Sequence, residues 1–259
     1  MTRPAKPAAL LRRVVLKISG EALQGAAGAN VAIEDITANN NGGVLSANVL
    51  LYLVKEIAEA VGIGVQVAVV VGGGNIVRGG ELMESKMGVS RVTGDYMGML
   101  ATVINGMALQ SALQGGGLDA RLQTAMNVEQ VAAPYIRQKA VRHLQAGRVV
   151  IFAGGTGNPY FTTDTAAALR AAEIGADALL KATNVDGVYS ADPAKDKNAE
   201  RYSTLTMNDA INKQLRVMDA TALTLCRDRK MPIHVFQLQK PGALMAVLRG
   251  EPEGTTIAA

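Results

Sequence analysis

Cysteine and aromatic residues are scarce in this chain of 259 residues, which has one Cys, no Trp, three Phe and six Tyr. Because Cys226 is alone, no disulfide can form within the chain, and a reducing compartment is expected. His143 and His234 lie far apart and lack the spacing of metal ligands, so no metal site held by the protein alone is predicted. The core is expected to consist of Val, Ile, Leu, Ala and Met.

Long hydrophobic runs are also missing. The strongest apolar stretch, 61–71, is interrupted by Gly62, Gly64 and Gln66 and is far too short to span a bilayer. The apolar run 8–11 near the start is too short for a signal peptide. No membrane partner is therefore predicted, and a cytoplasmic location is expected.

The excess of positive charge is small, because 26 Lys and Arg residues stand against 22 Asp and Glu residues, which gives a net charge of +4. Much of the excess lies in Arg3, Lys6, Arg12 and Arg13, so residues 1–12 are interpreted as a solvated basic tail. Nucleic-acid binding would require a clustered basic face with interleaved aromatic residues, and the sequence shows neither. A basic balance does suit a site for phosphorylated anions.

Apolar runs and helical repeats alternate along the chain. Short runs rich in Val, Ile and Ala predict strands at 13–18, 64–71, 148–153, 178–182 and 233–238. Helical spacing of apolar residues predicts helices around 49–60, from 97 to the glycines at 115–117, at 163–176 and at 208–229. This alternation predicts an α/β fold with an open, mainly parallel sheet and helices on both faces.

Glycines follow three of the predicted strands, at positions 20, 72–74 and 154–155. Ligands of open α/β sheets bind beyond the carboxyl ends of the strands, where glycine lets backbone N–H groups approach an anion. These junctions, with basic residues beside them, predict a polyphosphate site. No G-x-x-x-x-G-K-[ST] motif occurs, which excludes a P-loop kinase. Val77 replaces the third glycine of the dinucleotide fingerprint, which disfavours a Rossmann oxidoreductase.

Lys17 and Arg78 are the cations nearest these glycines. Each could be a fixed charge on a phosphoryl group or an ordinary exposed side chain. Segment 155–164 joins a predicted strand to a helix that Thr163 or Asp164 could cap, but it is longer than a cap needs and suits a small polar ligand. Segment 185–189 contains Asp-Gly and predicts a β-hairpin that turns at 186–187.

Together these segments resemble the bacterial-type UMP kinase family, a branch of the amino-acid-kinase superfamily. The matching strings are K-I-S-G-E-A-L at 17–23, G-G-G-N at 72–75 with R-G at 78–79, G-D-Y-M-G-M-L-A-T at 94–102, T-G-N-P-Y-F-T-T-D at 156–164, K-A-T-N-V-D-G-V-Y at 181–189 and D-P at 192–193. The resemblance implies one amino-acid-kinase domain over 13–259, with its acceptor-binding part at 13–165 and its ATP-binding part at 166–259.

The resemblance also implies roles for particular residues. Lys17, Asp164 and Asp219 would be catalytic, with the aspartates orienting the lysine or helping to place the Mg²⁺ that accompanies ATP. ATP would be held by Lys17, Ile18, Ser19, Gly20, Gly74, Arg78, Lys181, Thr183, Tyr189 and Asp192. UMP would be held by Gly73, Asp95, Thr156, Gly157, Asn158, Pro159, Tyr160, Phe161, Thr162 and Thr163.

The activity implied is transfer of the γ-phosphate of ATP to UMP, a step of pyrimidine nucleotide synthesis. The UMP phosphate is already an anionic nucleophile, so the protein's task is positioning and charge stabilisation. The family further implies GTP as an activator, UTP as an inhibitor, and a homo-oligomer, a hexamer assembled from dimers. The apolar helix that begins near Tyr96 is a candidate dimer surface.

Segment 26–46 departs from the family, because it is longer and rich in Asn where the family has a short segment associated with GTP activation. It is interpreted as a surface insertion that affects regulation. Two alternatives stay open at this point: an enzyme of the same fold acting on a carboxylate or carbamate, and a non-catalytic protein of the same fold that binds nucleotides or oxyanions.

Overall fold

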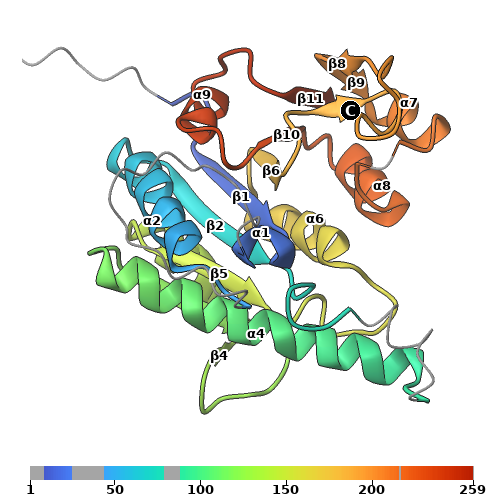
Figure 1. The fold of residues 1–259 in the computed structure, drawn as a ribbon. Coiled ribbons are helices and arrows are strands. Elements are labelled where there is room, and N and C mark those ends of the chain that lie inside the picture. Colours follow the sequence, from blue (N-terminus) through green and yellow to red (C-terminus); the bar gives the residue numbers. More distant parts are fainter. Residues whose placement is uncertain (1–8, 25–43, 79–87, 216, 259) are drawn as a thin grey trace, which may run out of the picture.

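The structure is a computed structural model that describes residues 9–24, 44–78, 88–215 and 217–258. Within these ranges, nine strands form one sheet in the order β4-β3-β5-β2-β1-β6-β10-β11-β9, and every neighbouring pair is parallel except β10 and β11 (Figure 1). These strands are β1 (Arg13–Ile18), β2 (Gln66–Val71), β3 (Ala120–Thr124), β4 (Ala133–Pro134), β5 (Val149–Ala153), β6 (Ala178–Thr183), β9 (Thr204–Thr206), β10 (Ile233–Gln237) and β11 (Thr255–Ala258). The α/β fold with an open, mainly parallel sheet is confirmed.

Helices cover both faces of this sheet. One buried cluster includes side chains of α1 (Gly20–Gln24), α2 (Ala47–Gly62), α4 (Arg91–Gly115) and α9 (Ala243–Leu248). The other includes side chains of α5 (Arg137–Gln145), α6 (Thr163–Ile174), α7 (Met207–Asn212) and α8 (Ala220–Asp228). Strand β1 alternates between them, because Val14, Leu16 and Ile18 belong to the first cluster and Val15 to the second. Lys17 therefore lies on the α6 side of the sheet.

The chain occupies the sheet in two blocks. Strands β1 to β5 make one end, and β6, β10, β11 and β9 make the other, so β1 and β6 meet in the middle. Figure 1 shows the long helix α4 beside the first block, whereas α7, α8 and the last strand lie at the opposite end of the molecule. The division of the domain at residue 165 stays a prediction.

Two predicted elements differ from the structure. The helix predicted at 208–229 is two helices, α7 and α8, because Gln214 takes a φ of 49° and Asp219 caps the start of α8 through the N–H of Ala222. The hairpin predicted at 185–189 is wrong as well. Both edges of β6 are occupied by β1 and β10, so β7 (Val188–Tyr189) pairs instead with β8 (Arg201–Tyr202).

Residues 1–8 of the predicted tail and 26–43 of the predicted insertion lie outside the described residues. The described ends of both segments contact the core. The N–H of Leu10 donates to the carbonyl of Leu248 over 2.9 Å, and the Ser46 side chain caps α2. Within the ranges that the structure describes, no helix is both long and apolar enough to cross a membrane.

Candidate functional site

Two glycine-containing turns meet at the carboxyl ends of β1 and β2. The strands pair in parallel with Ile18 opposite Val71, so the turns after them are neighbours. A Cβ atom on Gly20 would stand 2.5 Å from the amide N of Gly74, and one on Gly72 would stand 2.7 Å from the amide N of Gly20. Glycine is therefore required for this approach, which gathers backbone N–H groups at one place.

Two lysines, Lys17 buried and Lys181 largely buried, lie side by side on the sheet. Lys17 of β1 pairs in register with Lys181 of β6, and both side chains point to the face covered by α6. The Lys17 ammonium lies 2.9 Å from one carboxylate oxygen of Asp164, and the Lys181 ammonium lies 2.8 Å from the other. We call these three residues the Lys–Asp–Lys triad. Neither lysine is an ordinary exposed cation, because the side chains of Lys17 and Lys181 are only 10% and 14% exposed.

Electrostatics in the triad reflects a balance between burial and pairing. Burial alone would raise the pKa of Asp164, but Lys17 and Lys181 outweigh it and hold this pKa below the ordinary range. Burial lowers the pKa of Lys181, and the attraction of Asp164 opposes that change. With all three groups ionised, the triad carries one net positive charge, which suits an incoming phosphate.

Asp219 does not contact Lys17. Its carboxylate accepts hydrogen bonds from the hydroxyl groups of Thr162 and Thr165 and from the N–H of Ala222. It therefore connects the start of α8 to the start of α6, the helix that carries Asp164. The structure brings the three predicted catalytic residues to one cavity, where Asp164 contacts the lysines and Asp219 is held by Thr162 and Thr165.

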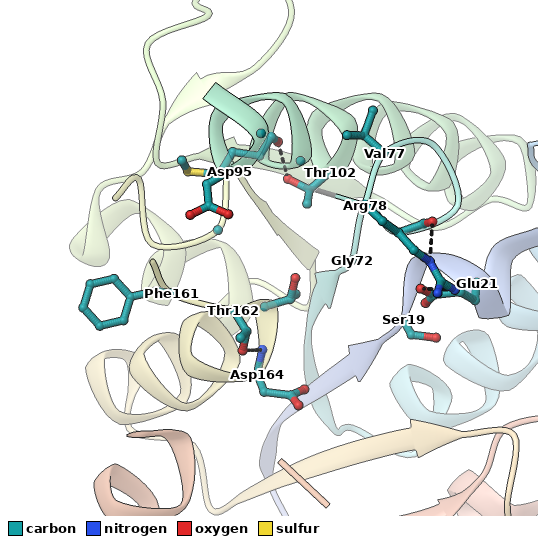
Figure 2. A pocket seen from close by; sticks show the side chains of 18 of the residues that line it. Ser19, Glu21, Gly72, Val77, Arg78, Asp95, Thr102, Phe161, Thr162 and Asp164 are labelled. Atoms are coloured by element: carbon teal, nitrogen blue, oxygen red, sulfur yellow. Dashed lines mark hydrogen bonds and ion pairs between the residues drawn. The ribbon is translucent and has the colours of Figure 1, made fainter. Parts of the chain in front are cut away.

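That first cavity has a volume of about 500 Å³ and lies beyond the carboxyl ends of β1, β2 and β5. The predicted residues that line it are Lys17, Ser19, Gly20, Gly73, Gly74, Arg78, Asp95, Phe161, Thr162, Thr163, Asp164 and Asp219. Figure 2 shows Asp164, Thr162 and Phe161 on one side of it, and Arg78, Glu21 and Ser19 on the other. Arg78 is held by Glu21, whose carboxylate lies 3.1 Å from the guanidinium group.

The turn after β5 is shaped by residues with positive φ. Gly154, Gly155 and Gly157 have φ values of 75°, 56° and 81°, and Tyr160 has a φ of 72°, which is rare for a side chain of its size. The carboxylate of Asp95 accepts the N–H of Tyr160 over 2.8 Å and is itself held by Arg91. Asp95 of α4 thus fixes the far end of this turn while facing the first cavity.

Five predicted acceptor residues and one predicted ATP residue are not part of the cavity walls. Thr156 to Tyr160 form the turn behind the cavity, where the Thr156 hydroxyl bonds to the backbone of Asn158. The side chain of Ile18 belongs to the buried core. The turn contributes Gly155 and Phe161 to the cavity instead.

A second cavity of about 690 Å³ lies on the β6 side of the triad. It is lined by the predicted ATP-binding residues Lys181, Thr183, Tyr189 and Asp192, together with Lys195, Lys213 and Gln214. Lys17 and Asp164 line the first cavity and Lys181 lines the second, so the triad stands between the two. Neither lining includes a His or Cys among the residues that the structure describes.

Sequence reasoning gave no role to Thr102, Arg91 or Glu21, which also line the first cavity. Thr102 is 3% exposed, and its hydroxyl oxygen accepts the N–H of Gly154 over 2.7 Å, so it fixes the turn after β5. Thr102 falls within the string at 94–102 that carried the resemblance, which was the available signal. The contact of Thr102 with Gly154 could not be predicted from the sequence, because only the fold brings these two residues together.

Two carboxylates of the first cavity fit the Mg²⁺ that is expected with ATP. In the described part of the chain, no cluster of three or more His, Cys, Asp or Glu could hold a metal. Asp164 and Asp219 both face the first cavity, and one or two carboxylates plus phosphate oxygens are what Mg²⁺ usually takes in such sites.

Comparisons with known proteins identify the family of the chain. The model of the amino acid kinase family matches residues 12–237. The chain is similar to the solved structure of UMP kinase from Bacillus anthracis, with 38% identity over 96% of each chain and a TM-score of 0.86. It is also similar to UMP kinase from Ureaplasma parvum, with 34% identity, a TM-score of 0.84 and coverage of 96% of this chain and 99% of that one.

A third similar structure is uridylate kinase from Archaeoglobus fulgidus, with 32% identity, a TM-score of 0.70 and coverage of 95% of this chain and 99% of that one. All three likenesses extend over nearly the whole chain, and the range matched by the family model contains the residues that line both cavities. The chain therefore belongs to the amino acid kinase family.

Proposed function

We propose that this protein transfers the γ-phosphate of ATP to UMP. The observation that carries the proposal is the position of the Lys–Asp–Lys triad between two cavities, each large enough to take a ligand. A donor nucleotide in the second cavity would direct its phosphates toward Lys181 and Lys17. An acceptor in the first cavity would present its phosphate to the same point. The similarity to UMP kinases over nearly the whole chain supports UMP as that acceptor.

The chemistry requires little from the protein beyond placement and charge. Two polyanions must approach each other, and Lys17, Arg78 and the backbone N–H groups of the glycine turns would offset their repulsion. The acceptor phosphate needs no general base, which agrees with the absence of His and Cys from the described walls of both cavities. Asp164 and Asp219 would help to place the Mg²⁺ that accompanies ATP, and that ion would supply further neutralisation of the phosphate charge.

The two ligands would occupy distinct cavities. Asp95, Phe161, Thr162 and Thr163 would hold UMP in the first, and Thr183, Tyr189 and Asp192 would hold the nucleoside of ATP in the second. Lys181 would contact the donor phosphates where the cavities meet. Asp164 would keep both lysines in place, since its two oxygens are each in contact with one ammonium group.

We also propose that the chain forms a homo-oligomer through helix α4. Six large apolar side chains of this helix are between 37% and 51% exposed, namely Val92, Tyr96, Met97, Leu100, Ile104 and Met107. Most are spaced by three or four residues, which places them on one face of the helix. An apolar stripe of this length suits burial against a second copy. We further propose that the chain assembles into a hexamer, is activated by GTP and inhibited by UTP, and is located in the cytoplasm.

A panel of acceptors tests the proposed reaction. The purified protein is mixed with ATP and Mg²⁺, and ADP formation is measured with UMP, CMP, dUMP, AMP, acetylglutamate, aspartate and carbamate, each with and without GTP. We expect UMP to be the preferred acceptor by a wide margin. Preference for a carboxylate or carbamate, or nucleotide binding without turnover of any acceptor, would refute the proposal.

A further inference from the structure

Two buried asparagines form a closed amide pair behind the glycine turns. The Asn105 amide nitrogen donates to the Asn75 side-chain oxygen over 2.7 Å, and the Asn75 amide nitrogen donates back to the Asn105 oxygen over 3.1 Å. Asn105 is in the middle of α4 and is 0% exposed, whereas Asn75 follows Gly74 and is 9% exposed. The pair therefore links a rigid helix directly to a turn that lines the first cavity.

Every N–H of the pair has an acceptor. The second N–H of Asn105 bonds to the carbonyl of Gly72 over 2.7 Å, and the second N–H of Asn75 bonds to the carbonyl of Val44 over 2.8 Å. Such a network contributes little net stability, since two amides have been moved out of water to make it. Its distinctive property is geometric, because a fully satisfied pair permits only one arrangement of the groups it joins.

The groups that the pair joins are the two glycine turns. The bond from the fully buried Asn105 directs the Gly72 carbonyl toward the core. The side-chain oxygen of Asn75 lies against Gly20, where a Cβ atom would come within 2.5 Å of it. The amide pair thus sets the position of the turn after β2 and forms the surface on which the turn after β1 rests.

A side chain of helix α4 also holds the turn after β5 by a hydrogen bond to its backbone. One helical turn before Asn105, the Thr102 hydroxyl accepts the N–H of Gly154. Strands β2 and β5 pair in parallel, with Val70 opposite Phe152, so Gly72 and Gly154 both lie two residues beyond one rung of the sheet. Polar groups three residues apart on α4 therefore hold adjacent turns on adjacent strands.

We propose that Asn105, paired with Asn75, is a positioning residue for phosphoryl transfer: it aligns the glycine turns whose N–H groups receive the transferring phosphate. The inference rests on the proposed function for the identity of that phosphate. Asn105 touches neither cavity, so its removal misplaces the turns without deleting a ligand contact. Transfer depends on alignment far more steeply than binding does, and a small misplacement can cost up to about 100-fold in rate.

The test compares Asn105→Leu, which keeps the number and branching of the side-chain heavy atoms and removes the amide, with Leu109→Ala one turn further along α4. Leu109 is also 0% exposed, but it packs in the apolar cluster and is not bonded to either turn. For Asn105→Leu we expect kcat to fall by roughly 10–100-fold, with KM for UMP and ATP within about 3-fold of the unchanged protein. For Leu109→Ala we expect lower thermal stability and a kcat within about 3-fold of the unchanged protein.

A kcat within about 3-fold for Asn105→Leu, or an equal kcat loss in both variants, would overturn the inference. If Asn105→Leu does not fold, Asn75→Ala takes its place, because it breaks the same pair from the other side. If both single variants fold, kcat of the double variant should be no more than about 2-fold below kcat of the less active single variant. Additive losses of kcat would contradict a pair that acts as a unit.

Hydrogen exchange separates this inference from the proposed function. Exchange at the 72–75 backbone should accelerate in Asn105→Leu and stay unchanged in Leu109→Ala, whatever the acceptor is. An unchanged protein that does not phosphorylate UMP would remove the proposed function, and the exchange result alone would then decide the inference. Faster exchange confined to Asn105→Leu supports alignment by the pair, and equal exchange in both variants contradicts it.

Discussion

Lys17 and Lys181 occupy paired positions on neighbouring parallel strands, and the carboxylate of Asp164 contacts both ammonium groups. Two like charges on adjacent strands would repel each other without that carboxylate. The pairing follows from the order of the sheet, since β1 and β6 are its central neighbours and belong to different halves of the chain. The triad therefore forms where those halves meet, between the two cavities.

Replacing Lys17 tests its role on the transferring phosphoryl group. Lys17→Met should lower kcat by roughly 10²–10³-fold with little change in UMP binding, the usual scale for losing one preorganised donor. Steady-state kinetics and equilibrium binding measure the two effects. Lys139→Met, a change at an exposed lysine on α5, is the matched control and should behave like the unchanged protein. A kcat within a few-fold for Lys17→Met would refute the role.

Replacing Asp164 tests the triad as a structural unit. Asp164→Asn leaves two largely buried ammonium groups without their shared carboxylate, and such a loss costs about 3–5 kcal/mol of unfolding free energy. Pairing with the lysines holds the pKa of Asp164 in the folded protein below its ordinary value of 3.8. The stabilisation that ionised Asp164 provides is therefore fully present above pH 3.8, and it is lost as the pH falls through the lower pKa of the folded protein.

Urea unfolding of both proteins at pH 7 and at acidic pH measures this contribution. The difference in stability should be large at pH 7 and shrink in acid. A difference that is small at pH 7, or that grows in acid, would contradict the charge assignment.

Replacing Asp95 tests the acceptor cavity. Asp95→Ala removes a carboxylate that faces the cavity and also releases the N–H of Tyr160, so KM for UMP should rise by roughly 10–150-fold, corresponding to about 1.5–3 kcal/mol. The KM for ATP should change much less. Asp95→Asn retains an acceptor for Tyr160 and separates the two effects. If Asp95→Ala weakened ATP binding and left UMP binding intact, the assignment of the two ligands to the two cavities would have to be reversed.

Cys226 is expected to be chemically inert in the folded protein. It is 0% exposed, and burial, with a smaller effect of Asp219, raises the pKa of its thiol to about 12. A thiol reagent at pH 8 should therefore label the chain only after denaturation. Since the unfolded thiol ionises near 9.0, this group should also reduce stability as the pH rises above that value. Rapid labelling of native protein would show that the core around α8 opens.

The apolar face of α4 predicts an assembly that a single charge can disrupt. Ile104→Glu should shift the protein to a smaller species in light scattering, because a carboxylate in a dimer surface is costly to desolvate. Leu51→Glu on α2 is the control, since Leu51 is 50% exposed and outside that face. Equal masses for Ile104→Glu and the unchanged protein would remove α4 from the interface.

The sequence predicted much of this molecule where the signal was local. The β-branched run of β1 and the glycines after β2 and β5 required only neighbouring residues to interpret. The amide pair did not, since Asn75 and Asn105 are distant in the chain and each alone is typical of a turn or a helix surface. The sequence predicts a single helix where the structure has α7 and α8, because the apolar spacing continues across the break. The positive φ of Gln214 carries no sequence signal of the kind glycine gives.

The most direct test follows the transferred phosphate itself. ATP labelled in its γ-phosphate is incubated with UMP and the purified protein, and the products are separated and counted. We predict label in the β-phosphate of UDP, one UDP for each ADP, and formation of both products that is roughly 10²–10³-fold slower in Lys17→Met. Label appearing only in inorganic phosphate, or in no product while both nucleotides bind, would contradict the account.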